Sequence, residues 1–272
     1  MSLTPSLSSP SLGPARPWAR RLGAFVGRDL LRQLRMGSSL FFIAVLPTAL
    51  FLMFGTLGEW NGFPLGHGNV MASTMTSMAL YGAVTATTGL AGTAAAERQA
   101  GWGRQLALTA LTPRDHMIGK ALVALAVAVL PVALVCTVGA LTGAELDGLG
   151  RWVATAALAL VGSLPFALYG LAAALLFRSE TAVSAASGLL VVFAFFGNLF
   201  IPLSGVVLDI ARFTPLYGAG VLARWPQMEG TVVSMDATAR TDSLGLAVVN
   251  LLTWTAVFAA LVLLARRRGT AR

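Results

Sequence analysis

The side chains capable of acid–base, nucleophilic or metal chemistry are few and widely separated in this sequence. It holds two histidines, His67 and His116, and a single cysteine, Cys136. Both histidines lie in connections between apolar runs, whereas Cys136 lies in the middle of one. Hydrolysis needs a nucleophile and a base within reach of each other, and neither a GxSxG nor an HExxH motif occurs. We therefore expect no catalysis by this chain and no bound metal or cofactor.

Two common sources of energy for solute movement are also missing from the sequence. The apolar runs contain no His, Asp, Glu, Lys or Arg away from their ends, although proton- and sodium-driven transporters usually carry ionisable residues there. No GxxxxGK[ST] phosphate loop is present. If the protein moves a solute, we expect the energy to come from another polypeptide.

The composition is that of a membrane protein. Hydrophobic residues make up 56% of the 272 residues and charged residues 11%, against roughly 25% charged in soluble domains. The net charge of +8 is spread over the segments between apolar runs, where basic residues set orientation. We therefore expect lipid and not nucleic acid as a partner.

The order of segments predicts one membrane domain, all-α, with flanking elements. Residues 1–17 are rich in Ser, Pro and Gly and are expected to form a disordered cytoplasmic tail. Residues 18–37 have apolar and basic residues on different faces, which predicts an amphipathic helix in the membrane interface; a helix docked on a soluble partner is the alternative. Residues 38–268 are expected to hold six spans of ~20 residues or more, at 39–58, 70–95, 117–142, 152–177, 181–203 and 244–265.

The distribution of basic residues predicts the orientation. Alternate connections and termini on one side carry 15 Lys and Arg, and those on the other side carry four. The positive-inside rule then places both termini in the cytoplasm. The predominance of Arg over Lys, with abundant Ala and Gly, suggests a GC-rich genome and hence the plasma (inner) membrane of a bacterium.

The long connection between the second and third spans is the most informative segment. Trp102, Leu106, Thr109 and Pro113 lie at helical spacing and are flanked by charges. A short, partly apolar cytoplasmic helix needs a surface to bury against. Two interpretations stay open: a helix lying in the lipid headgroups, or a docking element for a cytoplasmic partner.

The second span carries a polar stripe at spacings of 3, 4, 4 and 3, namely Thr74, Ser77, Tyr81, Thr85 and Thr88. Hydroxyls in hydrocarbon favour a partner or a cavity. The stripe could line a substrate path or serve ordinary helix packing, and packing is the favoured interpretation. Asn198, expected near the outer end of the fifth span, carries the same two possibilities.

The ordered set of motifs resembles the ABC-2 type permeases, the membrane subunits of ATP-binding-cassette export systems such as those of the daunorubicin-resistance type. In the connection between the second and third spans, the residues that carry the resemblance are Glu97, Arg98, Gly101, Leu106, Thr109, Leu111, Thr112, Pro113, Gly119 and Lys120. After the fifth span, the stretches 202–205 and 213–217 look like the re-entrant external helices of that family. The resemblance extends from the amphipathic helix to the sixth span.

The resemblance implies a working assembly. The permease would form a dimer, by default a homodimer, with two copies of an ABC ATPase that binds ATP and Mg. A coupling helix at about 98–112 would meet the ATPase through Trp102, Arg104 and Leu106, and Glu97 would end the second span and pair with Arg98 or with the partner. Drug, antibiotic, lipid and polysaccharide exporters share this architecture, and the apolar spans suggest a hydrophobic or amphipathic substrate. The alternative is a non-transporting scaffold or sensor subunit that also partners with an ATPase.

Overall fold

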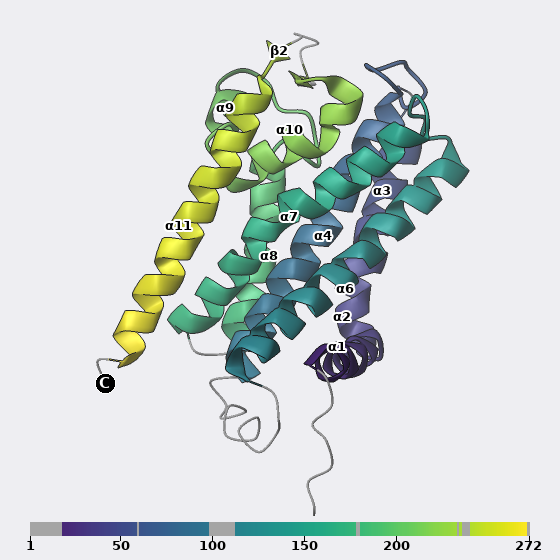
Figure 1. Ribbon diagram of the computed structural model, residues 1–272. Helices are drawn as coiled ribbons and strands as arrows, with labels where there is room; N and C mark the ends of the chain where they lie inside the picture. The colour runs from purple at the N-terminus through teal and green to yellow at the C-terminus, as the bar shows by residue number, and fades with distance from the viewer. Residues whose placement is uncertain are drawn as a thin grey trace, which may run out of the picture.

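The protein is a bundle of long helices with a short helix across one end (Figure 1). The computed structural model describes residues 18–58, 60–97, 112–177, 180–232, 234–235 and 240–270. Helix α1 (Trp18–Leu34) lies across the end of the bundle at which α11 (Leu244–Thr270) finishes. The opposite end holds α9 (Gly205–Ala211), α10 (Pro215–Met228) and the two-residue strands β1 (Thr231–Val232) and β2 (Arg240–Thr241). We refer to these as the α1 end and the α10 end.

Each of the six predicted spans falls on a helical segment. They correspond, in order, to α2 (Gly37–Leu40) with the π-helical turn η1 (Phe41–Val45) and α3 (Leu46–Thr56), then α4 (Val70–Glu97), α6 (Pro113–Thr142), α7 (Leu149–Phe177), α8 (Glu180–Phe196) and α11. Within the described residues, α6, α7 and α11 are long and apolar enough to cross a membrane on their own. Counting the bent pair α9–α10 as one span would make four. The fold therefore establishes an all-helical, multi-pass architecture without fixing the number of spans.

The first predicted span contains a π-helical turn next to a proline. Pro47 lies in the first turn of α3, and the amide of Leu46 donates to the carbonyl of Phe41. A proline lacks an amide hydrogen, and its ring clashes with the carbonyl four residues before it. The wider π turn relieves that clash, so the helix continues through Pro47, as the sequence predicts.

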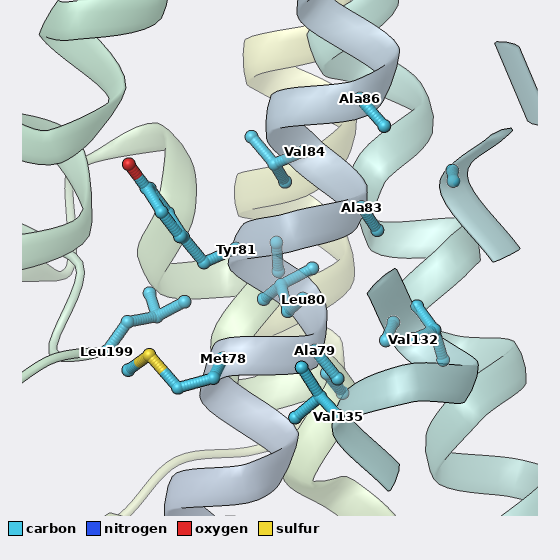
Figure 2. Packing of buried hydrophobic residues seen from close by; sticks show 14 of the residues in the cluster. Met78, Ala79, Leu80, Tyr81, Ala83, Val84, Ala86, Val132, Val135 and Leu199 are labelled. Atoms are coloured by element: carbon cyan, nitrogen blue, oxygen red, sulfur yellow. The ribbon is translucent and has the colours of Figure 1, made fainter. Parts of the chain in front are cut away.

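Helix α4 forms the centre of the core. Met75, Leu80 and Val84 on this helix are fully buried. In Figure 2, Val132 and Val135 of α6 approach one side of α4, and Leu199 lies near Met78 and Tyr81 on another. A helix surrounded in this way must carry small residues where other backbones come close.

Two glycines show how closely the neighbours approach α4. A Cβ on Gly82 would lie 2.6 Å from the Pro131 Cβ of α6, and a Cβ on Gly170 of α7 would collide with the Thr88 carbonyl. Both contacts are tighter than real Cβ atoms permit. At these two crossings, α4 therefore packs against α6 and α7 without free space between the helices.

Helix α8 ends earlier than the predicted fifth span, which extended to residue 203. The helix stops at Phe196, and Asn198 adopts a left-handed conformation with φ of 58°. Asparagine is one of the few residues that tolerates this region. Its side-chain oxygen accepts a hydrogen bond from the Leu203 amide at 2.7 Å, which stabilises the turn. Asn198 therefore lies beyond the helix as a turn residue.

The segment between α8 and α11 folds into two helices that meet at 91°. Asp242, which is buried, forms an ion pair with Arg212 and accepts a hydrogen bond from the Tyr217 hydroxyl at 2.5 Å. Arg240 pairs with Asp209 at 2.5 Å. Two arginines that the sequence suggests only as orientation signals are thus structural parts of this segment, which is either a broken span or a re-entrant loop.

The connections at the α10 end are also tied together. His67 lies between two carboxylates, with Nδ1 3.3 Å from Asp147 and Nε2 3.1 Å from Glu229. The amide of Gln227 donates to the carbonyls of Leu65 and Asn69. These bonds join the connection after α3, the connection after α6 and the end of α10 into one ordered cap.

Candidate functional site

Four charged side chains meet where α1 contacts the end of α4 and the start of α6. Lys120 of α6 places its amine 3.0 Å from Asp29 of α1 and 2.8 Å from Glu97, the last residue of α4. Arg32 of α1 lies 2.6 Å from Glu97 and 2.9 Å from Asp29. Each carboxylate therefore contacts both cations. We call these four residues the junction.

The junction is largely buried and its charges balance. The exposed fraction of the side chain is 7% for Asp29, 11% for Lys120 and 20% for Glu97, whereas Arg32 is 43% exposed. Burial alone would raise the pKa of Glu97, but hydrogen bonds from Lys120 and Arg32 outweigh it and lower the pKa below its usual value. The hydrogen bond to Glu97 raises the pKa of Arg32 in turn. Both shifts favour the charged forms of Glu97 and Arg32.

A second set of contacts fixes α1 to the first turns of α6. The Trp18 indole donates to Asp115 at 2.8 Å, and Asp115 and Thr112 form a reciprocal capping box at the start of α6. The hydrogen bonds from Trp18 and from the Thr112 backbone lower the pKa of Asp115.

The ring of Phe25 fills the space that Gly119 leaves open. A Cβ on Gly119 would lie 2.5 Å from the Phe25 Cδ1, and the Phe25 ring also lies 5.3 Å from that of His116. Any larger residue at position 119 would have to displace the Phe25 ring. The glycine of the Gly-Lys pair thus serves helix contact, and the lysine serves the ion pairs.

The junction connects the two helices that flank the segment 98–111, namely the end of α4 and the start of α6. We call these two helix ends the anchors of the segment. That segment leaves α4 after Glu97 and rejoins the described chain just before α6. Helix α1 contacts Glu97, at the end of α4, through Arg32, and Lys120, about two turns into α6, through Asp29. A force applied between the anchors would therefore be transmitted to α1, α4 and α6 together.

Only part of the predicted coupling set falls in the described residues. Glu97 is the last residue of α4, and Pro113, which the spacing assigns to the cytoplasmic helix, is instead the first residue of α6. The remaining predicted contacts lie outside the described residues, namely Arg98, Gly101, Trp102, Arg104, Leu106 and Thr109.

Sequence reasoning missed both partners of Glu97. Arg98 and the ATPase were the candidates that it proposed. The structure pairs Glu97 with Arg32 and Lys120, and Arg98 lies outside the described residues. Asp29 was a usable signal, because an acidic residue within a basic amphipathic helix, three positions before an arginine, is out of character with a surface that only meets lipid headgroups. Its distant partner could not be read from local spacing.

The polar stripe of α4 faces other helices of the same subunit. Thr88 donates to the Phe166 carbonyl of α7 at 3.2 Å, and Ser77 accepts a hydrogen bond at 2.8 Å from Arg224 of α10. Thr74 and Thr85 return their hydroxyls to carbonyls four residues earlier. All members except the half-buried Thr74 are buried, and Tyr81 packs edge-on against Phe200.

Arg224 is the buried charge that sequence reasoning placed in an external connection. It is 9% exposed and donates to Ser77 and, at 3.0 Å, to the carbonyl of Asn198. Two of the six residues proposed for a substrate path, Ser77 and Asn198, thus meet at one guanidinium. No group of three or more metal-ligating side chains comes together within the described residues.

Long apolar helices, a closely packed bundle and a charged junction at one end define an integral, multi-pass membrane protein. The family model of the ABC-2 type transporters matches residues 20–228, well over half of the chain. The chain therefore belongs to the ABC-2 type transporter family, and it is a membrane permease component of an ATP-binding-cassette transporter. Members of this family are transport subunits, generally not catalytic themselves, that work with an ABC ATPase subunit. No curated protein matches the sequence significantly.

Proposed function

We propose that this protein is the export permease of a bacterial ATP-binding-cassette system that moves a hydrophobic or amphipathic substrate out of the cytoplasm or inner leaflet. In the proposed assembly two permease copies form a homodimer and bind two copies of a separate ATPase. The observation that carries the proposal is the junction, because it ties α1, α4 and α6 to the two anchors of one connecting segment. A permease driven by a separate motor needs such a link.

In the proposed mechanism, the segment 98–111 transmits the movement of the ATPase to the membrane helices. ATP binding closes the two ATPase copies, whose surface contacts Trp102, Arg104 and Leu106. The displacement reaches Glu97 at one anchor and Lys120 beyond the other. Because the crossings of α4 have no slack, the helices respond by moving as bodies.

The proposed topology has six spans with both termini in the cytoplasm. Helix α1 and the end of α11 lie at the same end of the bundle (Figure 1), which agrees with termini on one side. Fifteen of 19 basic residues fall on that side of the predicted topology. The bent pair α9–α10 would then be re-entrant from the outer surface.

The proposal includes a substrate path along the polar stripe only where Ser77 contacts Arg224. Arg224 holds α10 against Ser77, so a path between α4 and α10 requires α10 to move away during the cycle. The alternative role of the stripe is packing, and its burial in the subunit supports that role.

The test begins with purification of the tagged protein from its native host in mild detergent, followed by the mass of the intact complex. We expect one ATPase chain per permease chain. Reconstitution into vesicles then compares Leu106→Asp with Leu108→Asp, a matched control on the opposite face of the predicted coupling helix. Only Leu106→Asp should abolish substrate-stimulated ATPase activity, with insertion unchanged.

The outcomes separate the candidate functions. A complex without any nucleotide-binding protein would overturn the proposal. An ATPase that co-purifies but never responds to substrate would favour the scaffold or sensor role.

A further inference from the structure

The outward face of α1 contains a basic hollow that shares only Arg32 with the junction. A cavity of about 490 Å³ is lined by Arg28, Leu31, Arg32, Arg35 and Met36. The arginines follow spacings of 4 and 3, which places them on one face of the helix. The buried positions Leu22, Asp29 and Gln33 lie on a different face of the helix. The hollow therefore adjoins the junction and shares Arg32 with it.

Two of its three arginines are unpaired. Arg28 and Arg35 are exposed and form no ion pair or side-chain hydrogen bond with any residue that the structure describes. Arg32 already binds Asp29 and Glu97 but remains 43% exposed. Three guanidinium groups around one hollow, with only one of them neutralised, create a site for an anion.

The apolar lining points to an anion that carries hydrocarbon. Leu31 is 56% exposed and Met36 is 47% exposed, and both line the same hollow as the arginines. A free phosphate or nucleotide would leave these side chains uncovered. A phospholipid covers both kinds of surface, because its phosphate meets the guanidinium groups and its glycerol and first methylenes meet the apolar side chains.

The depth of the hollow agrees with a headgroup. Met36 precedes Phe41 by five residues, which along a helix is about 7.5 Å. Phe41, Phe42 and Val45 are 49%, 57% and 48% exposed, as expected for side chains that face lipid tails. The headgroup layer of one leaflet is about 5–8 Å thick. If the hydrocarbon begins near Phe41, the hollow lies within that layer.

We propose that the hollow formed by Arg28, Leu31, Arg32, Arg35 and Met36 binds the headgroup of an anionic phospholipid of the surrounding leaflet. Occupation would bring a phosphate beside Arg32, the residue that also holds Glu97 at the end of α4. Anionic lipid would thereby act on the junction directly. The proposal takes from the proposed function only the position of α1 at the membrane surface, and binding is measurable without transport.

The test is a titration of the delipidated, detergent-purified permease with phosphatidylglycerol and, separately, phosphatidylcholine, followed by native mass spectrometry. Wild type should bind phosphatidylglycerol more tightly. Each basic residue near an anionic surface contributes about fivefold to affinity, so Arg28→Gln/Arg35→Gln should bind phosphatidylglycerol roughly 30-fold more weakly. Phosphatidylcholine binding should not change.

The matched control is Arg20→Gln/Arg266→Gln, which removes the same two charges from exposed positions outside the hollow. This variant should keep a phosphatidylglycerol affinity within about threefold of the wild-type value. Equal losses of affinity in both double variants would show that only net charge matters and would overturn the proposed site. Equal wild-type affinity for both lipids would do the same.

Two further outcomes are decisive. If Arg28→Gln/Arg35→Gln retains phosphatidylglycerol but no longer co-purifies with its ATPase, the face belongs to the protein partner and the proposal fails. If that variant does not stay folded, as judged by gel filtration, Leu31→Glu replaces it. Leu31→Glu puts a negative charge into the hollow and should weaken phosphatidylglycerol binding by at least fivefold, and unchanged binding would overturn the proposal.

Discussion

Replacing Lys120 by methionine is the most direct perturbation of the junction. Lys120 is 11% exposed and contacts Asp29 at 3.0 Å and Glu97 at 2.8 Å. Removing one partner of a buried ion pair costs about 3–5 kcal/mol, because the other charge stays buried. Arg32 still contacts both carboxylates after the change, so we expect the lower end of that range, a loss of about 3 kcal/mol in the free energy of unfolding.

Arg32→Met is the matched comparison within the same cluster. Its side chain is 43% exposed, and Lys120 remains to neutralise the carboxylates. Water and Lys120 together should limit the loss to about 1 kcal/mol or less. A third variant, Asp29→Asn/Lys120→Met, returns the cluster to zero net charge and should recover part of the stability lost in Lys120→Met.

The assay is reversible unfolding of the purified permease in mixed micelles, combined with distances between spin labels at Gly23 of α1 and Leu122 of α6 in a Cys136→Ser background. Lys120→Met should broaden the distance distribution as α1 detaches from α6, and Arg32→Met should leave it narrow. The reasoning is refuted if Lys120→Met and Arg32→Met lose the same stability within about 0.5 kcal/mol. That result would mean that the burial of Lys120 does not control the cost.

Three further outcomes follow from the same geometry. Gly170→Ala, whose Cβ would strike the Thr88 carbonyl, should lower the free energy of unfolding by about 3 kcal/mol or more. Gly89→Ala, with open space around it, should be neutral or stabilising. Equal effects of the two variants on stability would contradict the close crossing of α4 and α7. Acidification should leave α1 docked down to about pH 4.5 and release it only as the pH falls further, because the folded-state pKa values of Glu97 and Asp115 lie below their ordinary 4.5 and 3.8. Their stabilisation is complete above the ordinary values and is lost as pH falls through the lowered ones; Glu97→Gln should shrink the change in spin-label distance. Arg224→Met removes the hydrogen bonds from Arg224 to Ser77 and to the Asn198 carbonyl and should cost about 2–3 kcal/mol. Thr85→Val should cost less than about 1 kcal/mol, because its hydroxyl bonds only within α4, to Tyr81; a Thr85→Val variant with altered substrate preference would make the stripe a path.

The sequence predicts the helices well because their signal is local. An apolar run of ~20 residues is a property of consecutive positions, and the described helices overlap all six predicted ranges. The start of α6 was predicted four residues late, at 117, although Thr112 and Pro113 form its cap and first turn. The early end of α8 was also missed, because Asn198 stops the helix through its backbone conformation and its bond to Leu203.

The partners of polar residues were the part that the sequence could not supply. Spacing shows that Ser77 and Thr88 share a face of α4, yet it does not show that α10 and α7 cover them. Likewise, Asp29 and Lys120 are 91 residues apart in the chain, and only the packing of α1 on Gly119 brings them together. Two of the four junction residues, Glu97 and Lys120, were therefore identified from the sequence through the motif resemblance. The other two, Asp29 and Arg32, were identified only from the structure.

Helix α4 joins the junction to the contact between Ser77 and Arg224, and its packing decides where movement can occur. Ser77 and Glu97 are separated by about 30 Å along the helix, and between them Gly82 meets Pro131 and Thr88 meets Gly170 without space to compress. A displacement that enters at Glu97 therefore has to carry α4 together with the neighbours it touches at those glycines. The bond between Arg224 and Ser77 differs in kind, because a guanidinium–hydroxyl hydrogen bond can be exchanged for one to water. Relative motion driven from the junction should accordingly appear between α4 and α10, before it appears between α4 and either α6 or α7.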